Sequence, residues 1–441
     1  MKKSSLFQLA WPIFLNGVLG IILGFIDVFV LSKVNDLAAS AVSAACQITS
    51  ICSLLISAVC SAACIMIAQY IGKGDRERVS RISTLCIAIN VVLGIGIFIV
   101  VLLFRDTFLV MLGAKEELYH MASEYLKILV WGIVLDAYSS TIGNILYSHG
   151  KIKISVMISA SMSTFNLILD MFLVLGLCGL PRLEVRGAAI ATVITKIIWA
   201  VLISLFFFSG TESITIFKLL KEVHLKEVVL VFKLGIPSVF DSMNYSITQL
   251  VITGIIFHYL SQNEIIARTY LMNIAAFFNQ VTNALASATQ IMIGHEIGAG
   301  HYEKAESDCY HCLKLSLAAT FVISGGAVLF SKQLFGIFTS NQEVLQIGFY
   351  LMLVNVMVEM GRALNVVIIW SLRGAGDVSF PVFIAACCMW VVAVGGSYGI
   401  VRLTTLGIIG VWIMSGIDEV VRGLIIIARW KSGKWKEKVL C

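Results

Sequence analysis

The chain has 441 residues, of which 59% are hydrophobic and only 13% are charged, and its formal net charge is +6. A soluble globular chain carries roughly 45–50% apolar and about 25% charged residues, so the composition excludes an ordinary soluble protein. The positive balance does not require a nucleic-acid partner, because most of the cations flank apolar segments. The chain is therefore expected to be an integral membrane protein.

Apolar segments long enough to cross a bilayer follow one another along the chain. A spanning helix needs about 20 mostly apolar residues. The first such segment, residues 9–31, is longer than the roughly 7–15-residue core of a signal peptide. The predicted spans are residues 9–31, 39–70, 83–104, 122–147, 154–178, 187–209, 229–258, 266–297, 312–332, 345–371, 380–400 and 407–429.

Lysine and arginine residues gather on one side of these spans. With a cytoplasmic N-terminus, 18 of the 32 cations flank the spans on the cytoplasmic side and 7 flank them on the other. Cytoplasmic loops carry the excess of Lys and Arg, so both termini are expected in the cytoplasm of a multi-pass protein of the plasma (inner) membrane. The basic segment 429–438 is interpreted as a contact with anionic membrane lipid.

The sequence repeats itself at a nearly constant offset, which relates residues 65–74 to residues 291–300. Six of these ten aligned positions are identical. Two further pairs share this offset to within one position: Pro12 with Pro237, and Gly150 with Gly376. Three separated segments with one offset indicate an internal duplication.

The duplication predicts the fold. Six helices in each half return the chain to its starting side, so the halves share one orientation, as in parallel-repeat transporters. We expect an all-α integral membrane protein of about twelve transmembrane helices, in two six-helix lobes related by a pseudo-two-fold axis along the membrane normal. The predicted lobes are residues 1–210 and 229–441, joined by a cytoplasmic connector, residues 211–228.

No motif of an enzyme or an ATPase is found. The sequence lacks the GxxxxGK[ST] phosphate loop, the HExxH pair and the GxSxG elbow. No catalytic residue and no cofactor are therefore expected, and a membrane-embedded enzyme would need a constellation that the sequence does not show. Cys309 and Cys312 form a CxxC pattern, but they lie where a helix enters the membrane, which argues against a zinc site. Transport would then be driven by an ion gradient.

Charged residues inside the spans are the candidates for ion coupling, because each costs at least about 2.5–3.5 kcal/mol on insertion scales. Asp27 lies deep in the first span, or else near its outer end. Asn166 and Asp170 are four residues apart and share a helix face, where their oxygens suit a sodium ion or a proton. The alternative for this pair is a structural hydrogen bond between helices, worth about 0.6 kcal/mol. Pro12 breaks the hydrogen bonding of the first span and is a candidate hinge.

Further charged residues lie at equivalent positions of the two halves. Asp136 and Arg362 are related by the repeat offset, and Lys196 and Glu419 are related by nearly the same offset. Glu359 precedes Arg362 by three residues, so the two either serve a site or neutralise each other. Lys196 and Glu419 are interpreted as snorkelling or paired. The candidate site residues of the second half are Asp241, Glu359, Arg362 and Asn365.

Four signatures extend over nearly the whole chain: Pro12 with Asp27; residues 69–75, QYIGKGD; residues 166–170, NLILD; and residues 372–377, LRGAGD, followed by Pro381. Together they resemble the multidrug and toxic compound extrusion family of antiporters. The resemblance implies two lobes around a central cavity. It also implies export of small lipophilic, often cationic compounds, coupled to Na⁺ or H⁺.

The resemblance also implies a cation site in the N-terminal lobe. That site maps onto Asp27, Asn166 and Asp170, with Na⁺ at the two aspartates as the only metal, and Thr192 matches a threonine that often joins it. Some relatives carry a glutamate eight residues after the proline of span seven. That position is Tyr245 in this chain, which argues against their second site.

The rival function is that of a lipid-linked oligosaccharide flippase of related fold. Moving a large anionic headgroup favours several basic residues in the cavity, whereas Lys196 and Arg362 are the mid-span cations of this sequence. We expect a monomer that acts on small molecules within membrane lipid and binds no nucleic acid.

Overall fold

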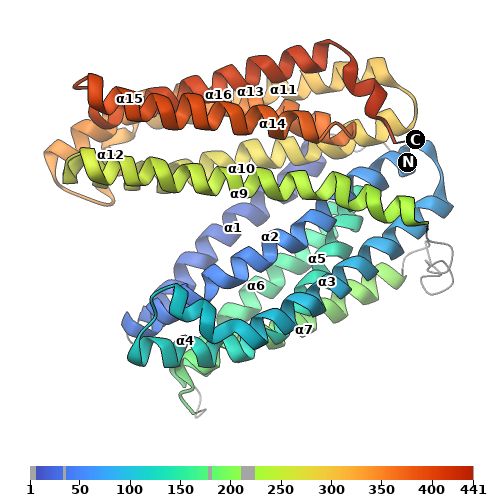
Figure 1. Cartoon of the computed structure of the whole chain (residues 1–441), viewed down its shortest axis with the longest axis horizontal. Helices are drawn as coiled ribbons and strands as arrows, with labels where there is room; N and C mark the ends of the chain where they lie inside the picture. Colours follow the sequence, from blue (N-terminus) through green and yellow to red (C-terminus); the bar gives the residue numbers. More distant parts are fainter. Residues whose placement is uncertain (1–5, 33–35, 177–180, 210–223, 441) are drawn as a thin grey trace. The chain divides into compact units, whose positions relative to one another are not determined.

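The chain is almost entirely helical. The computed structural model describes residues 6–32, 36–176, 181–209 and 224–440, without the side chains at 25, 27–29, 31, 32 and 36. Within these ranges every regular element is a helix, which confirms the predicted all-α class (Figure 1). Most of the predicted connector, residues 211–228, lies outside the described residues.

The helices separate into two compact units. The N-terminal unit comprises residues 15–67 and 75–235, and the C-terminal unit comprises residues 1–14, 68–74 and 236–441. Both units therefore draw on α1 (Leu6–Ser32) and α2 (Asp36–Lys73). The remaining helices of the N-terminal unit are α3 (Arg76–Met111), α4 (Glu116–Leu129), α5 (Trp131–Ser148), α6 (Ile152–Leu175), α7 (Glu184–Ser209) and the start of α9 (Leu225–Tyr259).

The C-terminal unit continues from α9. Its further helices are α10 (Gln262–Gly298), α11 (Tyr302–Leu329), the short α12 (Ser331–Gly336), α13 (Gln342–Gly374), α14 (Ser379–Cys388), a π-helical segment (Met389–Gly395), α15 (Gly396–Leu403), α16 (Gly407–Lys431) and a 3₁₀ turn (Lys434–Lys438). Helix α14, the π-helical segment and α15 follow without a break and form one apolar span.

The helices fit the twelve spans predicted from the sequence. Eight described helices are long and apolar enough to cross a membrane, and the pair α4–α5, bent by 47°, adds a ninth span. Helices α9, α10 and α16 have 35, 37 and 25 residues, which also suffices at 1.5 Å per residue. In these three helices, polar or charged side chains lie within the apolar stretch. On α16, Asp418, Glu419 and Arg422 are buried.

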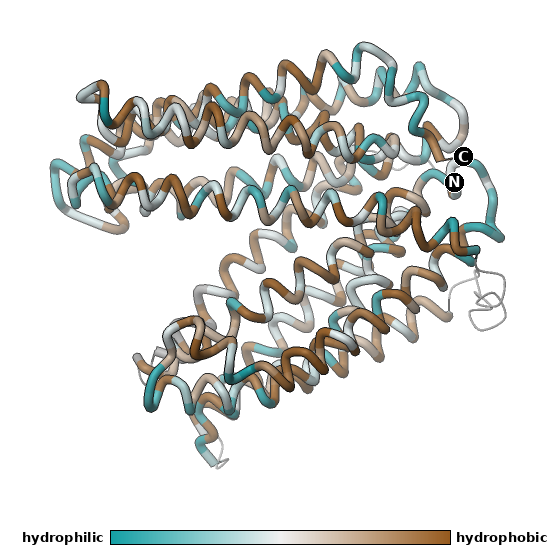
Figure 2. Tube along the Cα trace, viewed as in Figure 1, coloured by the Kyte–Doolittle hydropathy of each residue, from teal (hydrophilic) through white to brown (hydrophobic). Residues whose placement is uncertain are grey.

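Hydrophobic residues recur along the helices (Figure 2), and many large apolar side chains of the spans are exposed, as expected of surfaces that contact lipid. On α3, Val92, Ile95, Ile99 and Leu103 are 44–69% exposed and recur at helical spacing. The opposite face holds Asn90, which is fully buried and donates a hydrogen bond to the Thr141 hydroxyl of α5 at 2.7 Å. The polar groups thus find hydrogen-bond partners inside the protein, and the apolar groups face the lipid.

The internal repeat is visible in the backbone. Gly74 and Gly300, which are related by the repeat offset, both have a φ of +79°, and Gly150 and Gly376 have φ values of +73° and +92°. Each glycine ends a helix through a hydrogen bond to the carbonyl three residues earlier. The first-half copy at Gly150 has lost most of the LRGAGD signature, yet it keeps the turn, because only glycine adopts this left-handed conformation without strain.

The ends of α2 and α10 cross at equivalent points of the repeat. A Cβ atom on Gly72 would collide with the carbonyl of His295, and one on Gly298 would collide with the carbonyl of Gln69. Gly72 and Gly298 are themselves related by the repeat offset, so the two contacts mirror each other. Gln69 also donates to the Gly374 carbonyl at 2.7 Å, which ties this crossing to the end of α13.

The C-terminal tail packs against the C-terminal unit, and its interpretation as a lipid contact stays a prediction. Trp435 is fully buried and stacks on Trp430 with a centroid separation of 4.6 Å. Arg429 pairs with Asp377 at 2.8 Å, and the Leu440 amide donates to the Gln69 side chain at 2.9 Å. The tail lysines at 431, 434 and 438 are exposed and remain available to lipid headgroups.

We expect Gly298→Ala to destabilise the protein by about 1–3 kcal/mol, because its methyl group can be accommodated only by moving backbone. Gly96→Ala in α3 is the matched control, since nothing lies within 4 Å of its added Cβ atom, and it should be neutral or slightly stabilising. Thermal unfolding of the purified variants in detergent measures the difference. Equal melting temperatures would show that the α2–α10 crossing tolerates a side chain.

Candidate functional site

Helix α6 carries the first two site residues on one face. Asn166 and Asp170 are one helical turn apart, and Asp170 is only 7% exposed. The amide nitrogen of Asn166 is buried and has no hydrogen-bond partner within the described part of the chain. The amide group is therefore free to turn its oxygen toward an ion or a polar ligand.

Helix α7 brings Thr192 beside this face. The two helices pack closely because Gly187 leaves no space for a side chain: a Cβ atom there would lie 2.6 Å from the Leu173 carbonyl oxygen. The Thr192 hydroxyl donates to the Ala188 carbonyl at 2.9 Å, and Thr195 donates to Ala191 at 2.8 Å. With their hydrogens used in the helix, both hydroxyl oxygens keep lone pairs that can accept a proton donor or ligate a cation.

Tyr125 of α4 completes the group and was not expected from the sequence. It is 5% exposed, makes a side-chain hydrogen bond with Thr192 and interacts electrostatically with Asp170. A tyrosine in a partly polar helix before a bend gives no distinctive pattern. Only the packing of α4 against α7 places it at the site.

A cavity of about 150 Å³ opens between α5, α6 and α7. It is large enough for several water molecules at roughly 30 Å³ each. Two of its lining residues are the predicted Asn166 and Thr192. The others are Asp136, Ser159, Met162, Ser163, Thr195, Lys196 and Trp199.

An ion pair crosses the cavity. Lys196 of α7 contacts Asp136 of α5 at 2.5 Å, and the two side chains are 19% and 25% exposed. The structure thus decides between snorkelling and pairing for Lys196: it is paired. The charge of Lys196 is therefore balanced by Asp136. The polar residues of α6 in the cavity lining, Ser159, Ser163 and Asn166, are neutral.

Two predicted residues lie in α1. Asp27 is a residue of this helix, but its side chain lies outside the described residues. Pro12 lies within the unbroken helix Leu6–Ser32. The structure therefore shows where both stand along α1, and their roles in coupling and bending stay predictions.

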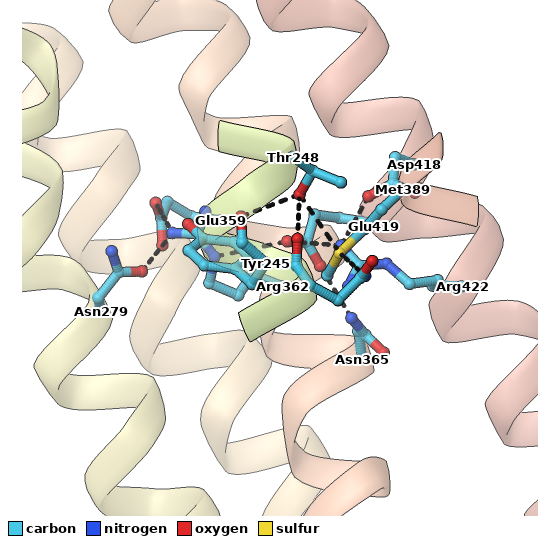
Figure 3. A network of polar contacts seen from close by, with 11 residues as sticks. Tyr245, Thr248, Asn279, Glu359, Arg362, Asn365, Met389, Asp418, Glu419 and Arg422 are labelled. Carbon is cyan, nitrogen blue, oxygen red and sulfur yellow. Dashed lines mark hydrogen bonds and ion pairs between the residues drawn. The ribbon is translucent and has the colours of Figure 1, made fainter. Parts of the chain in front are cut away.

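The C-terminal unit contains a second, larger polar cluster (Figure 3). Glu359 contacts Arg362 at 2.8 Å, so the two do neutralise each other, and Arg362 also donates to Asn279 of α10. Asn365 donates to Glu419 of α16 at 2.9 Å. The three predicted residues of α13 are therefore brought together.

Two charged members of this cluster, Asp418 and Arg422, were not singled out from the sequence. Arg422 contacts Asp418 at 2.6 Å and Glu419 at 3.0 Å, all three on α16. The sequence could have indicated Asp418 and Arg422, because they are opposite charges four residues apart in the middle of a predicted span. Asp241, the remaining predicted residue, pairs with Arg373 at 2.7 Å.

Comparison with known proteins identifies the family. The MatE family model matches residues 12–172 and 237–398, most of the chain. The chain belongs to the MatE family. This confirms the resemblance to multidrug and toxic compound extrusion transporters, and the chain is accordingly a multi-pass membrane transporter. The second match of the MatE model begins and ends at the offset of the internal repeat from the first, to within one position.

Individual MatE relatives cover nearly the full length. The chain is 28% identical to the uncharacterized transporter YisQ of Bacillus subtilis, covering 99% of this chain and 96% of YisQ. It is 22% identical to the probable multidrug resistance protein NorM of Thermotoga maritima, covering 99% and 94%.

Solved structures share the fold. An outward-facing multidrug resistance MATE family transporter superposes with a TM-score of 0.88 at 21% identity, covering 97% of this chain and 96% of that one. A MOP superfamily transporter of Pyrococcus furiosus, described as having a binding pocket of reverse polarity, gives a TM-score of 0.87 at 20% identity, covering 98% and 96%.

The ion pair in the cavity can be tested by stability. Lys196→Met is expected to cost about 1–3 kcal/mol, because it leaves the half-buried Asp136 carboxylate without its partner. The double variant Asp136→Asn/Lys196→Met should recover most of that loss, as a double-mutant cycle measures. Lys127→Met on the exposed side of α4 is the control and should change little. Additive losses in the double variant would show that the two side chains do not interact.

Proposed function

We propose that this MatE transporter is a cation-coupled antiporter that exports small lipophilic, cationic compounds by alternating access. The coupling site is the group of Asn166, Asp170 and Thr192, joined by Asp27 of α1. The observation that supports it is the buried Asp170 carboxylate on the same helix face as Asn166, which lines the cavity with Thr192.

The residues present suit either coupling ion. Carboxylate, amide and hydroxyl oxygens are hard ligands of the kind that metal cations such as Na⁺ prefer. A carboxylate can equally take up a proton. In both cases the bound cation neutralises Asp170 and removes the cost of a charge in low dielectric.

Coupling requires that the cation bind the two access states with different affinities. Neutralisation of Asp170 would lower the free energy of the state that releases substrate, and a bend at Pro12 would carry the change along α1. By linkage, a substrate that favours the opposite state weakens cation binding by the same factor. The exchange of bound cation for substrate then needs no cofactor other than the coupling ion.

The proposal also covers the oligomeric state, the membrane location and the partners of the transporter. The transporter works as a monomer in the plasma (inner) membrane, with both termini in the cytoplasm, and its partners are the transported small molecule and membrane lipid. The names of the relatives NorM and of the outward-facing MATE transporter support export of drugs.

We expect Asp170→Asn to abolish gradient-driven efflux of a lipophilic cationic dye from proteoliposomes, because an amide cannot alternate between charged and neutral forms. Equilibrium dye binding should survive in part, since other side chains contact the substrate. Asp106→Asn in α3, whose side chain is 52% exposed, is the matched control. Efflux is measured under an imposed Na⁺ gradient and, separately, an imposed proton gradient, which identifies the ion. Wild-type efflux by Asp170→Asn would rule out this coupling site.

The membrane orientation has its own test. Cysteines placed at Lys73 and Lys304, which flank equivalent turns of the repeat, should both be protected from an impermeant thiol reagent outside the cell. A cysteine at Lys332, on the opposite side by the positive-inside rule, should be labelled. The background lacks the exposed Cys46 and Cys387. Labelling of only one of the two protected positions would contradict parallel halves.

A further inference from the structure

Five charged side chains of α13 and α16 form a row with alternating signs. Arg362 contacts Glu359 at 2.8 Å and Glu419 at 3.7 Å. Arg422 contacts Glu419 at 3.0 Å and Asp418 at 2.6 Å. The order is therefore Glu359, Arg362, Glu419, Arg422, Asp418, with a carboxyl group at each end. Figure 3 shows Asn279 at one end of the cluster and Asp418 with Arg422 at the other.

The row lies deep inside the C-terminal unit. Glu359 is the eighteenth of 33 residues in α13, and Asp418 is the twelfth of 25 in α16, so both stand near the middle of a spanning helix. Their side chains are 0% and 4% exposed. A carboxyl oxygen of each, Oε2 of Glu359 and Oδ1 of Asp418, is buried without a hydrogen-bond partner within the described residues.

The charges of the row do not balance. Three carboxylates and two guanidinium groups leave one negative charge when every group is ionised. Nearby groups on other helices do not supply the missing positive charge. Asp241 of α9 interacts with Arg422 but has its own partner, Arg373.

Other polar neighbours are uncharged or distant. Tyr245 of α9, beside Arg362, and Cys388 of α14, beside Asp418, are neutral in their protonated forms. Arg268 of α10 is buried, but it donates to Thr253. It also interacts electrostatically with Tyr245, which lies at the Arg362 end of the row and not at the Asp418 end.

The contacts place the surplus negative charge at one end. Arg362 is nearer to Glu359 than to Glu419, so its charge serves mainly Glu359. Arg422 contacts two carboxylates, Asp418 and Glu419, at similar distances. Glu419 also accepts a hydrogen bond from the Asn365 amide. Asp418 accepts from Arg422 alone among the side chains that the structure describes, and it is the least stabilised of the three anions.

We propose that Asp418 is a proton-binding site, which carries an exchangeable proton on its unpartnered oxygen Oδ1. The bound proton makes the row electrically neutral, and its loss leaves one uncompensated negative charge in the middle of the C-terminal unit. Oδ2 keeps its contact with Arg422 in both forms. This site is separate from the coupling group on α6 and α7 and does not depend on the proposed antiport.

The proton can be observed directly on the purified full-length protein in detergent. Infrared spectroscopy resolves the C=O stretch of a protonated carboxyl group, which shifts when the solvent is exchanged for D₂O. We expect such a band at mildly acidic pH, lost as the pH rises, and weaker in Asp418→Asn. Asp377→Asn is the matched control, because Asp377 is equally buried but has Arg429 at 2.8 Å as its own partner, and it should leave the band unchanged.

A second variant tests the charge balance without removing the carboxyl group. Glu359→Gln removes one negative charge from the far end of the row. Arg362 can then pair with Glu419, and Arg422 can pair with Asp418. Asp418 should then release its proton at a lower pH than in the wild-type protein. A wild-type band in Asp418→Asn, or an unchanged pH dependence in Glu359→Gln, would overturn the proposal. Because neither measurement uses transport, failure of the proposed antiport leaves this result intact.

Discussion

A charge in the middle of a spanning helix has to find its partner inside the protein, because hydrocarbon does not solvate it. This constraint accounts for the arrangement of the buried side chains in both units. Lys196 reaches Asp136 in the N-terminal unit, and Arg422 holds two carboxylates in the C-terminal unit. The buried Asp170 instead has the hydroxyl group of Tyr125 as a neighbour.

The same constraint explains how the two halves diverged. Asp136 and Arg362 are related by the repeat offset, and Lys196 and Glu419 are related by an offset three residues shorter. In one unit the pair is aspartate with lysine, and in the other it is arginine with glutamate, with the signs exchanged between the helices. A contact between equivalent helices has thus been kept while its polarity was reversed, because either polarity satisfies the low-dielectric interior.

Backbone geometry was conserved more strictly than side-chain chemistry. The turn at Gly150 keeps the left-handed conformation of its counterpart Gly376, although the residues around it have changed. At the crossing of α2 and α10, Gly72 and Gly298 remain glycine because each faces a carbonyl of the other helix. A steric requirement of this kind admits one residue type, whereas an electrostatic requirement can be met by several.

The sequence by itself determined the membrane class, the number of spans and the internal repeat, because hydropathy and a fixed offset are properties of the chain alone. It also placed Asn166 and Asp170 on one helix face, since their spacing matches a helical turn. The partners of the buried charges were decided only by tertiary structure. No spacing in the sequence joins Tyr125 to Thr192 or Lys196 to Asp136, because such contacts depend on which helix faces meet, and that is set by the packing of residues far apart in the chain.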